Sequence, residues 1–185
     1  MFGTSDRLPK SSVSKPIITF LRVLNVEVKL DETELKSVQN RLGGVVGSRG
    51  DAADSLQWLC YAGADRDDRW VLWLLSGEMN GGSVGGFLWR RISPSTSVDP
   101  RCGLLGKSAI TITLPKPILL GMREPELLHV LGAPTKRQAN RYLYVHQHDS
   151  KSAGQKESST SANTVSILLG DGVVRGIEVW QTSFF

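Results

Sequence analysis

Residues 81–85 read Gly-Gly-Ser-Val-Gly and match the G-x-S-x-G pattern of serine hydrolases, in which the serine hydroxyl attacks a carbonyl carbon. That chemistry requires the serine on a sharp turn between a strand and a helix. Here the pattern joins two β-rich runs, and residues 87–92 do not have a helical pattern. We therefore predict a hairpin loop and no catalytic residues, and we keep a serine hydrolase using Ser83 as an alternative function.

Residues 106–108 (Gly-Lys-Ser) are similar to the end of a phosphate-binding loop. The full pattern needs its first glycine at position 101, which is an arginine in this chain. The run that follows, residues 109–114, is strand-like, so no helix N-terminus is available to face a phosphate. The sequence therefore argues against a phosphate-binding loop.

His146 and His148 place two imidazoles on one side of a predicted strand, next to Asp149. Such a pair can hold zinc when a third ligand completes the site. No third ligand has a suitable spacing here. We therefore predict no metal site and no cofactor, and we assign both histidines to an exposed strand surface.

Strands place alternate side chains on opposite faces, and the aromatic residues of the second half of the chain gather on one of them. Leu143 and Val145 are predicted to face a helix, together with the aliphatic positions of the later strands. Rigid rings anchor many protein interfaces, although cross-strand aromatic pairs also stabilise ordinary sheets. Aligning the first half with the second at the turn between their last two strands adds Trp73 and Trp89 to the aromatic face. We predict a partner-binding face formed by Trp73, Trp89, Tyr142, Tyr144, His146, His148 and Trp180.

The elements that must position these side chains form a unit that occurs twice. Residues 17–44 and residues 110–134 each contain a β-rich run followed by a short amphipathic helix that ends at Leu-Gly. Asp31 and Glu34 have the spacing of a capping box for the first helix, and Pro125 suits the first turn of the second. After each helix we predict three strands, at residues 56–61, 70–75 and 87–92 in the first copy and at residues 141–146, 164–169 and 173–181 in the second.

The element order β-α-β-β-β, repeated, predicts an α+β fold: tandem units that form an antiparallel sheet, with one helix per unit packed on one face. We divide the chain into a flexible N-terminal segment (residues 1–16), a first repeat (17–92), a connector (93–109) and a second repeat (110–185). Within the second repeat, the polar stretch at residues 149–163 predicts a mobile loop.

Short segments of the second repeat resemble a known unit: GM at residues 121–122, ELL at 126–128, LGAPT at 131–135, YLY at 142–144, GDGVV at 170–174 and IEV at 177–179. Together they look like one SmpA/OmlA-type (BamE-like) unit, which occurs in an outer-membrane assembly lipoprotein. In tandem, the units resemble the β-lactamase-inhibitor-protein-like (BLIP-like) fold, whose members bind other proteins on a sheet face. The resemblance covers residues 119–181 in sequence and residues 17–92 in topology alone, and it implies a protein partner. The lipobox cysteine is missing here.

Composition limits the class of partner. Hydrophobic residues make up 40% of the 185-residue chain and charged residues 22%, which are ordinary globular values. No stretch approaches the ~20 apolar residues of a membrane-spanning helix. The 22 basic and 18 acidic residues give a net charge of +4, and the basic residues are scattered rather than gathered in a stripe. We therefore expect no nucleic-acid partner and no membrane span.

The two cysteines and the N-terminus bear on the compartment. Cys60 lies in an apolar run and Cys102 in a connection rich in Pro and Gly, so we expect two free thiols, with a single bridge as the alternative. Residues 1–15 lack the apolar core of a signal peptide. We expect a cytoplasmic protein if Met1 is the native start, and a periplasmic or secreted protein if a leader was removed.

These observations together predict a non-enzymatic protein-binding module that uses an aromatic sheet face. An inhibitor, an immunity-type protein that neutralises a toxin and an assembly factor would all fit this description. Beside the serine hydrolase, a module that carries a small ligand in a cleft between the two repeats is the remaining alternative.

Overall fold

The computed structural model describes residues 15–51, 54–65, 68–105, 112–150 and 159–184. Of these residues, 52% are strand and 13% are helix. The fold is therefore mostly antiparallel β-sheet, and the predicted α+β class, with one helix per unit packed on one face, is wrong. The physical reason is that each α-helix has only 8 residues, whereas the longest strands have 12. A second small sheet, rather than the helices, covers the middle of the large one.

The described residues contain two α-helices, one 3-10 helix and twelve strands. The helical elements are α1 (Leu35–Leu42), η1 (Glu78–Asn80) and α2 (Glu124–Leu131). The strands are β1 (Phe20–Val23), β2 (Val26–Lys29), β3 (Gly47–Arg49), β4 (Leu56–Asp65), β5 (Asp68–Gly77), β6 (Gly86–Ile92), β7 (Gly103–Leu104), β8 (Ile112–Thr113), β9 (Lys136–Gln138), β10 (Arg141–Ser150), β11 (Ser159–Gly170) and β12 (Val173–Phe184).

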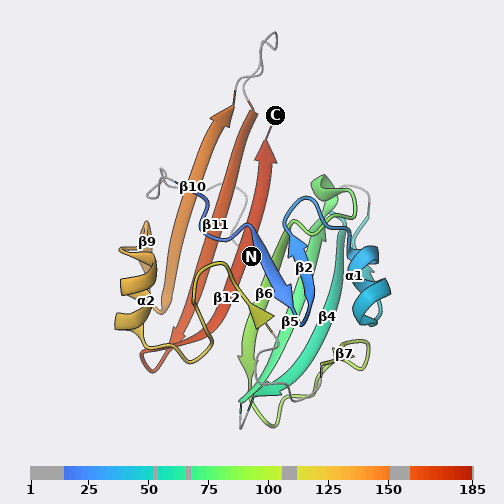
Figure 1. Cartoon of the computed structure of the whole chain (residues 1–185), viewed down its shortest axis with the longest axis horizontal. Coiled ribbons are helices and arrows are strands. Elements are labelled where there is room, and N and C mark those ends of the chain that lie inside the picture. The colour runs from blue at the N-terminus through green and yellow to red at the C-terminus, as the bar shows by residue number, and fades with distance from the viewer. Residues whose placement is uncertain (1–14, 52–53, 66–67, 106–111, 151–158, 185) are drawn as a thin grey trace.

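The large sheet has the order β3-β4-β5-β6-β12-β11-β10-β9, and β7 pairs in parallel with the edge of β4. The small sheet has the order β2-β1-β8. Figure 1 shows the small sheet lying across the middle of the large one, with α1 and α2 near its two opposite edges. We call the side of the large sheet that carries the helices and the small sheet the inner face, and the opposite side the outer face.

The inner face carries the main core. Side chains of the small sheet, such as Leu21 and Val23, are fully buried in one cluster with Phe87 of β6 and Ile177 of β12. The inner side of the junction between the halves is thus filled by packed side chains.

The two halves hold their helices by equivalent hydrogen bonds. Each half runs from a helix through one short and three long strands, and its helix ends at a glycine with a positive φ. The Tyr61 hydroxyl donates to the carbonyl of Gly43 at 3.0 Å, and the Tyr144 hydroxyl donates to the carbonyl of Gly132 at 3.3 Å. In both halves, therefore, a tyrosine of the first long strand satisfies the exposed C-terminal end of the helix.

The halves meet where β6 pairs with β12, and this junction is symmetric. In each half, a valine amide donates a hydrogen bond to the turn before the helix: Val84 at 2.8 Å before α1, and Val174 at 2.9 Å before α2. The two valines are therefore equivalent, and equivalent residues near β6 and β12 differ by 90 in number (174 − 84). At the junction Leu88 pairs with Glu178, which also differ by 90 (178 − 88). A residue that pairs with its own equivalent lies on a local two-fold axis, so a pseudo-dyad passes between Leu88 and Glu178.

One buried amide joins the start of the described chain to its last third. The Asn163 Oδ1 atom of β11 accepts a hydrogen bond from the amide of Ile17 at 3.0 Å, and its Nδ2 atom donates to the carbonyl of Ile18 at 2.8 Å. Asn163 belongs to the segment predicted as a mobile loop, residues 149–163. The structure instead extends β10 to Ser150 and begins β11 at Ser159, and residues 151–158 lie outside the described residues.

Candidate functional site

Three of the predicted contact residues belong to the core. Trp89 is 6% exposed, Tyr142 6% and Tyr144 0%, and all three lie on the inner face. The reason is register: Tyr142 pairs with Ile167 and Tyr144 pairs with Val165, so both tyrosines share the face of these aliphatic residues. The predicted faces of β10 are therefore exchanged, and we remove the three residues from the candidate surface.

Each of these rings has a packing or hydrogen-bonding role on the inner side. Trp89 contacts Trp70 edge to face, with ring centroids 6.5 Å apart. The Tyr142 hydroxyl donates to the carboxylate of Glu124 in α2, and this hydrogen bond is the main cause that raises the pKa of Tyr142. The Arg137 guanidinium lies 4.7 Å from the centre of the same ring. These contacts fasten α2 and the end of β9 to β10.

The two strand histidines lie on the same side of β10 as Tyr144, His146 half-buried and His148 exposed. Within the described ranges, no group of three or more His, Cys, Asp or Glu residues is placed to hold a metal ion.

Ser83 lies just before strand β6 and pairs with Glu34 in an isolated bridge. The strand-turn-helix arrangement of a nucleophilic serine is not present at this position, because β6 follows. Residues 106–108, which carry the Gly-Lys-Ser sequence, lie outside the described residues.

The two remaining predicted residues, Trp73 and Trp180, share the outer face, and both are half-buried. Cross-strand pairing places them around the pseudo-dyad, where one row of neighbours runs through β5, β6, β12, β11 and β10. We call this surface the dyad face. It consists of Trp73, Leu88, Arg90, Arg141, Leu143, Ser166, Glu178 and Trp180.

A fixed polar network lies at the centre of the dyad face. The Glu178 carboxylate accepts a hydrogen bond from Arg141 Nη1 at 3.1 Å and another from Trp180 Nε1 at 3.0 Å. Arg141 Nη1 also donates to the Ser166 hydroxyl at 3.2 Å. Hydrogen bonds between charged groups are stronger than neutral ones, and shared partners hold one another in place. The network therefore holds the Trp180 ring and the Arg141 guanidinium in place on the dyad face.

A glycine lets the Trp180 ring lie close against the neighbouring strand. Gly86 pairs with Trp180, and a Cβ atom at Gly86 would lie only 2.7 Å from two atoms of the ring. Real Cβ atoms are not found at such distances. A side chain at position 86 would therefore collide with the ring and with the carbonyl oxygen of Val179.

On the other side of the pseudo-dyad, Arg90 is exposed and its guanidinium carbon lies 6.0 Å from the centre of the Trp73 ring. This separation lies at the outer limit of a cation–π contact. Gly176 pairs with Arg90, and a Cβ atom at Gly176 would lie 3.4 Å from the Cβ atom of Arg90, so the glycine lets the Arg90 stem lie close to β12.

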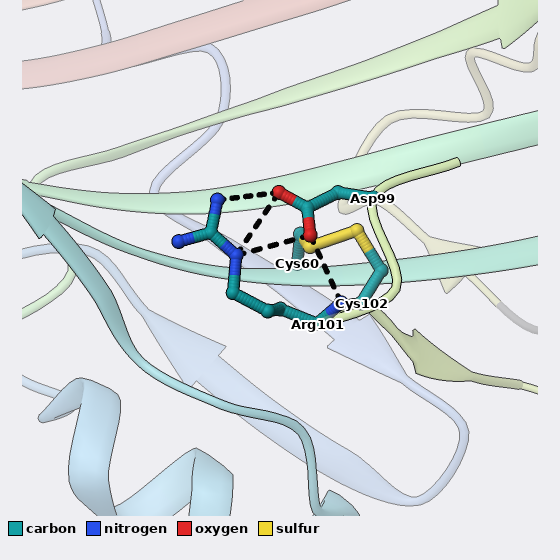
Figure 2. The surroundings of a disulfide bond; sticks show 4 residues. All are labelled: Cys60, Asp99, Arg101 and Cys102. Carbon is teal, nitrogen blue, oxygen red and sulfur yellow. Dashed lines mark hydrogen bonds and ion pairs between the residues drawn. A yellow bond between two sulfur atoms is a disulfide. The ribbon is translucent and has the colours of Figure 1, made fainter. Parts of the chain in front are cut away.

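A disulfide borders the dyad face and corrects the expectation of free thiols. Cys60 of β4 is bonded to Cys102, 42 residues later in the sequence (Figure 2). The bond fastens residues 93–102, which we call the strap, to the outer face of the first half. Cys60, Ala62, Val71, Ile92 and Cys102 form a second buried cluster there, with Val98 of the strap and Trp73 packed against it.

Polar contacts hold the rest of the strap. Arg69 Nη1 of β5 donates to the carbonyls of Pro94 and Thr96, at 2.5 and 3.2 Å. Asp99 and Arg101 form an ion pair beside the disulfide, as Figure 2 shows, and hydrogen bonds from Arg101 lower the pKa of the Asp99 carboxyl to about 2. The strap is therefore a fixed border of the dyad face on the side of the first half.

At the equivalent place in the second half, the described residues include no strap, although Val145 and Ala162 on the same face are fully buried. In the first half, Leu88 pairs with Trp73, and Trp73 pairs with Cys60. In the second half, Glu178 pairs with Ser166, and Ser166 pairs with Leu143. Cys60 and Leu143 are therefore equivalent positions, each two strands away from the pseudo-dyad. Cys60 is 1% exposed under the strap, whereas Leu143 is half-buried with part of its side chain in contact with water. The partly exposed apolar side chains around the pseudo-dyad are Trp73, Leu88, Leu143 and Trp180.

Two general findings complete the description. In the described part of the chain, no helix is long and apolar enough to cross a membrane. Compared with protein-family models, with curated proteins and with solved structures, this chain matches none.

Proposed function

We propose that the protein is a non-enzymatic module that binds another protein, and that the dyad face is its contact surface. The observation that carries this proposal is the group of half-buried apolar side chains on the outer face around the pseudo-dyad: Trp73, Leu88, Leu143 and Trp180. Tryptophan is enriched at the energetic centre of interfaces, because a rigid ring buries a large area at a small entropic cost.

The setting of these side chains supports binding with little rearrangement. The dyad face spans five neighbouring strands of one sheet, so its backbone is held by ladder hydrogen bonds on both sides of each central strand. A preorganised surface loses less conformational entropy on binding than a loop does. The disulfide-bonded strap adds a border that is equally fixed.

The polar groups of the dyad face are also suited to burial. A carboxylate that loses its water without a partner is strongly destabilising. Glu178 already accepts hydrogen bonds from Arg141 and Trp180, so a partner can cover it without leaving it unpaired. An inhibitor, an immunity-type protein and an assembly factor would all use such a surface in the same way.

Site-specific photo-crosslinking tests the proposal. We would place a photo-reactive amino acid at Leu143 in the full chain, express it in cells that make the protein naturally, and irradiate. We expect a discrete crosslinked protein at Leu143. The control is the same amino acid at Lys36, which is exposed on α1, and it should not give this product.

Substitutions then test whether the captured protein uses the dyad face. Trp180→Ala and Leu88→Lys should each weaken its binding about tenfold or more in calorimetry, because truncating an interface anchor costs more than about 1.4 kcal/mol. Circular dichroism should show an unchanged fold. The proposal would be overturned by identical crosslinked products at Leu143 and Lys36, or by a binding affinity that neither substitution changes.

A further inference from the structure

The charges of the outer face are unevenly matched. Where the structure describes the strap, Asp99 and Arg101 pair with each other. On the dyad face, Arg141 pairs with Glu178, at 3.1 Å. Arg90 is the second arginine of the dyad face, and the contact recorded for its guanidinium is the ring of Trp73. The described side chains of the dyad face thus hold two cationic groups and one anionic group.

The position of Arg90 makes this excess charge part of any interface. Arg90 lies two residues from Leu88 on the same face of β6, and its guanidinium lies over Trp73 of the adjacent strand. A partner that covers these two apolar side chains must also cover Arg90. The ring contact uses no N–H group, so the guanidinium donors stay available to a partner.

Burying an unpaired guanidinium costs several kcal/mol, which is comparable to the gain from an apolar anchor. A carboxylate on the partner offsets this cost through paired N–H···O bonds, whereas a basic group at the same place adds repulsion. The scattered basic residues of the chain do not form the stripe that tracks a nucleic-acid backbone.

We infer that the dyad face selects a protein partner that presents a carboxylate next to an apolar side chain, with Arg90 receiving the carboxylate and the surface between Trp73 and Trp180 receiving the apolar group. This inference rests on the proposed function, because it names the partner chemistry of the same surface. The carboxylate belongs to an Asp or Glu side chain of a segment that lies across the pseudo-dyad.

Peptide selection tests the inference without a known partner. A phage-displayed library of random peptides would be selected in parallel on the immobilised wild-type protein and on the Arg90→Glu variant. We expect the wild type to enrich peptides in which Asp or Glu adjoins an aromatic or aliphatic residue. The Arg90→Glu variant should lose this enrichment and select Lys or Arg at the same place.

Synthetic copies of the selected peptides supply the quantitative test. Arg90→Glu should weaken the binding of an acidic peptide about tenfold or more, and Arg90→Lys should weaken it less, because lysine keeps the charge and loses the paired hydrogen bonds. Lys36→Glu makes the same change in net charge on exposed α1 and should leave binding unchanged. Each variant should unfold at the wild-type temperature.

The outcomes separate the inference from the proposed function. Peptides whose binding is weakened by Trp180→Ala and Leu143→Lys but not by Arg90→Glu, or peptides without an acidic preference, would overturn the inference and leave the surface assigned. Peptides whose affinity is unchanged by Trp180→Ala and Leu143→Lys, or a library that yields no binder, would overturn both the inference and the proposed function.

Discussion

The two halves of the large sheet are alike on the inner face and different on the outer face. On the inner face, Tyr61 and Tyr144 donate equivalent hydrogen bonds to the glycine carbonyl at the end of each helix. On the outer face, Cys60 is bonded to a strap that covers the first half, and its equivalent Leu143 is half-buried. The halves therefore share this helix-terminal contact on the inner face and differ at the equivalent position of the outer face.

This difference separates a covered outer surface in the first half from a partly exposed one next to the pseudo-dyad. The strap converts the outer face of the first half into a small second core, which contributes to stability. The second half keeps aliphatic and charged side chains in contact with water, next to the pseudo-dyad. Under the proposed function, a surface that serves binding lies beside one that serves folding, although both halves have the same order of strands.

The largest expected effect contrasts an inner with an outer tryptophan. Trp89→Ala should lower the free energy of unfolding by about 4 kcal/mol, because it leaves a large cavity in the main core. Trp73→Ala should lower it by about 1 kcal/mol, because that ring is half-buried at the edge of the dyad face. Urea unfolding followed by circular dichroism measures both values. Equal losses would contradict the assignment of inner and outer faces.

Removal of the disulfide should sharpen the contrast between the two outer faces. The double substitution Cys60→Ala and Cys102→Ala should lower the free energy of unfolding by about 3 kcal/mol, because the unfolded chain loses a constraint and the strap loses its anchor. Amide hydrogen exchange should accelerate in the strap and in β4. Equal acceleration in β10 and β11 would mean that the strap supports the whole sheet rather than one half.

The smallest effects should be the same in both halves. Tyr61→Phe and Tyr144→Phe each remove one hydroxyl that donates to a helix-terminal carbonyl, and each should cost about 1 kcal/mol. The two losses should add, because the sites share no partner. A marked difference between the two single variants, measured by urea unfolding, would break the equivalence of the inner faces.

The pH dependence gives an independent check on Tyr144. Burial raises the pKa of Tyr144 from 10.0 to about 12. The unfolded chain therefore releases this proton near pH 10, whereas the folded protein keeps it until about pH 12. The stabilising contribution is complete below the lower value and is lost as the pH rises through the upper one. The stability advantage of the wild type over Tyr144→Phe should shrink across this interval, and an advantage that stays constant would contradict burial of the hydroxyl.

Sequence patterns located the helices because their signals are local. Both helices end at the predicted Leu-Gly steps, Gly43 and Gly132, where the backbone adopts the positive φ that glycine favours. Asp31 was predicted as a capping residue and has another role: the first helix begins after Glu34, and the Asp31 carboxylate accepts a hydrogen bond from Asn80 Nδ2 at 2.9 Å. That contact joins residues 49 positions apart and cannot be read from local spacing.

The faces of the strands were predictable only where one side is plainly aliphatic. Val165 and Ile167 are buried on the inner face, as the alternation indicates. The tyrosines of β10 were assigned to the opposite face because Leu143 and Val145 were predicted to form the aliphatic side of that strand. A phenol suits either face, and its burial depends on an acceptor that the sequence does not reveal. The α+β class was wrong for a related reason. Nothing in the β-rich run before each helix indicates that the two runs pair with each other in a separate small sheet.

The dyad face could not be predicted, because it depends on the register between β6 and β12. Leu88 and Glu178 become neighbours through one long-range pairing, and that pairing then sets the positions of Arg90 and Arg141 on the same surface. The disulfide also depends on long-range structure. Cys60 and Cys102 were recognised as a possible pair, but their approach depends on the path of the strap across the sheet.

The hydrogen bonds of Asn163 also constrain the order in which the chain can fold. The backbone groups of Ile17 and Ile18 lie 146 and 145 residues from the side chain that holds them. Since a ribosome releases the N-terminus first, these groups must wait for most of the polypeptide to be made before they meet their partner. Contacts of such long sequence separation slow folding. The contact of Ile17 and Ile18 with Asn163 is therefore among the last to form.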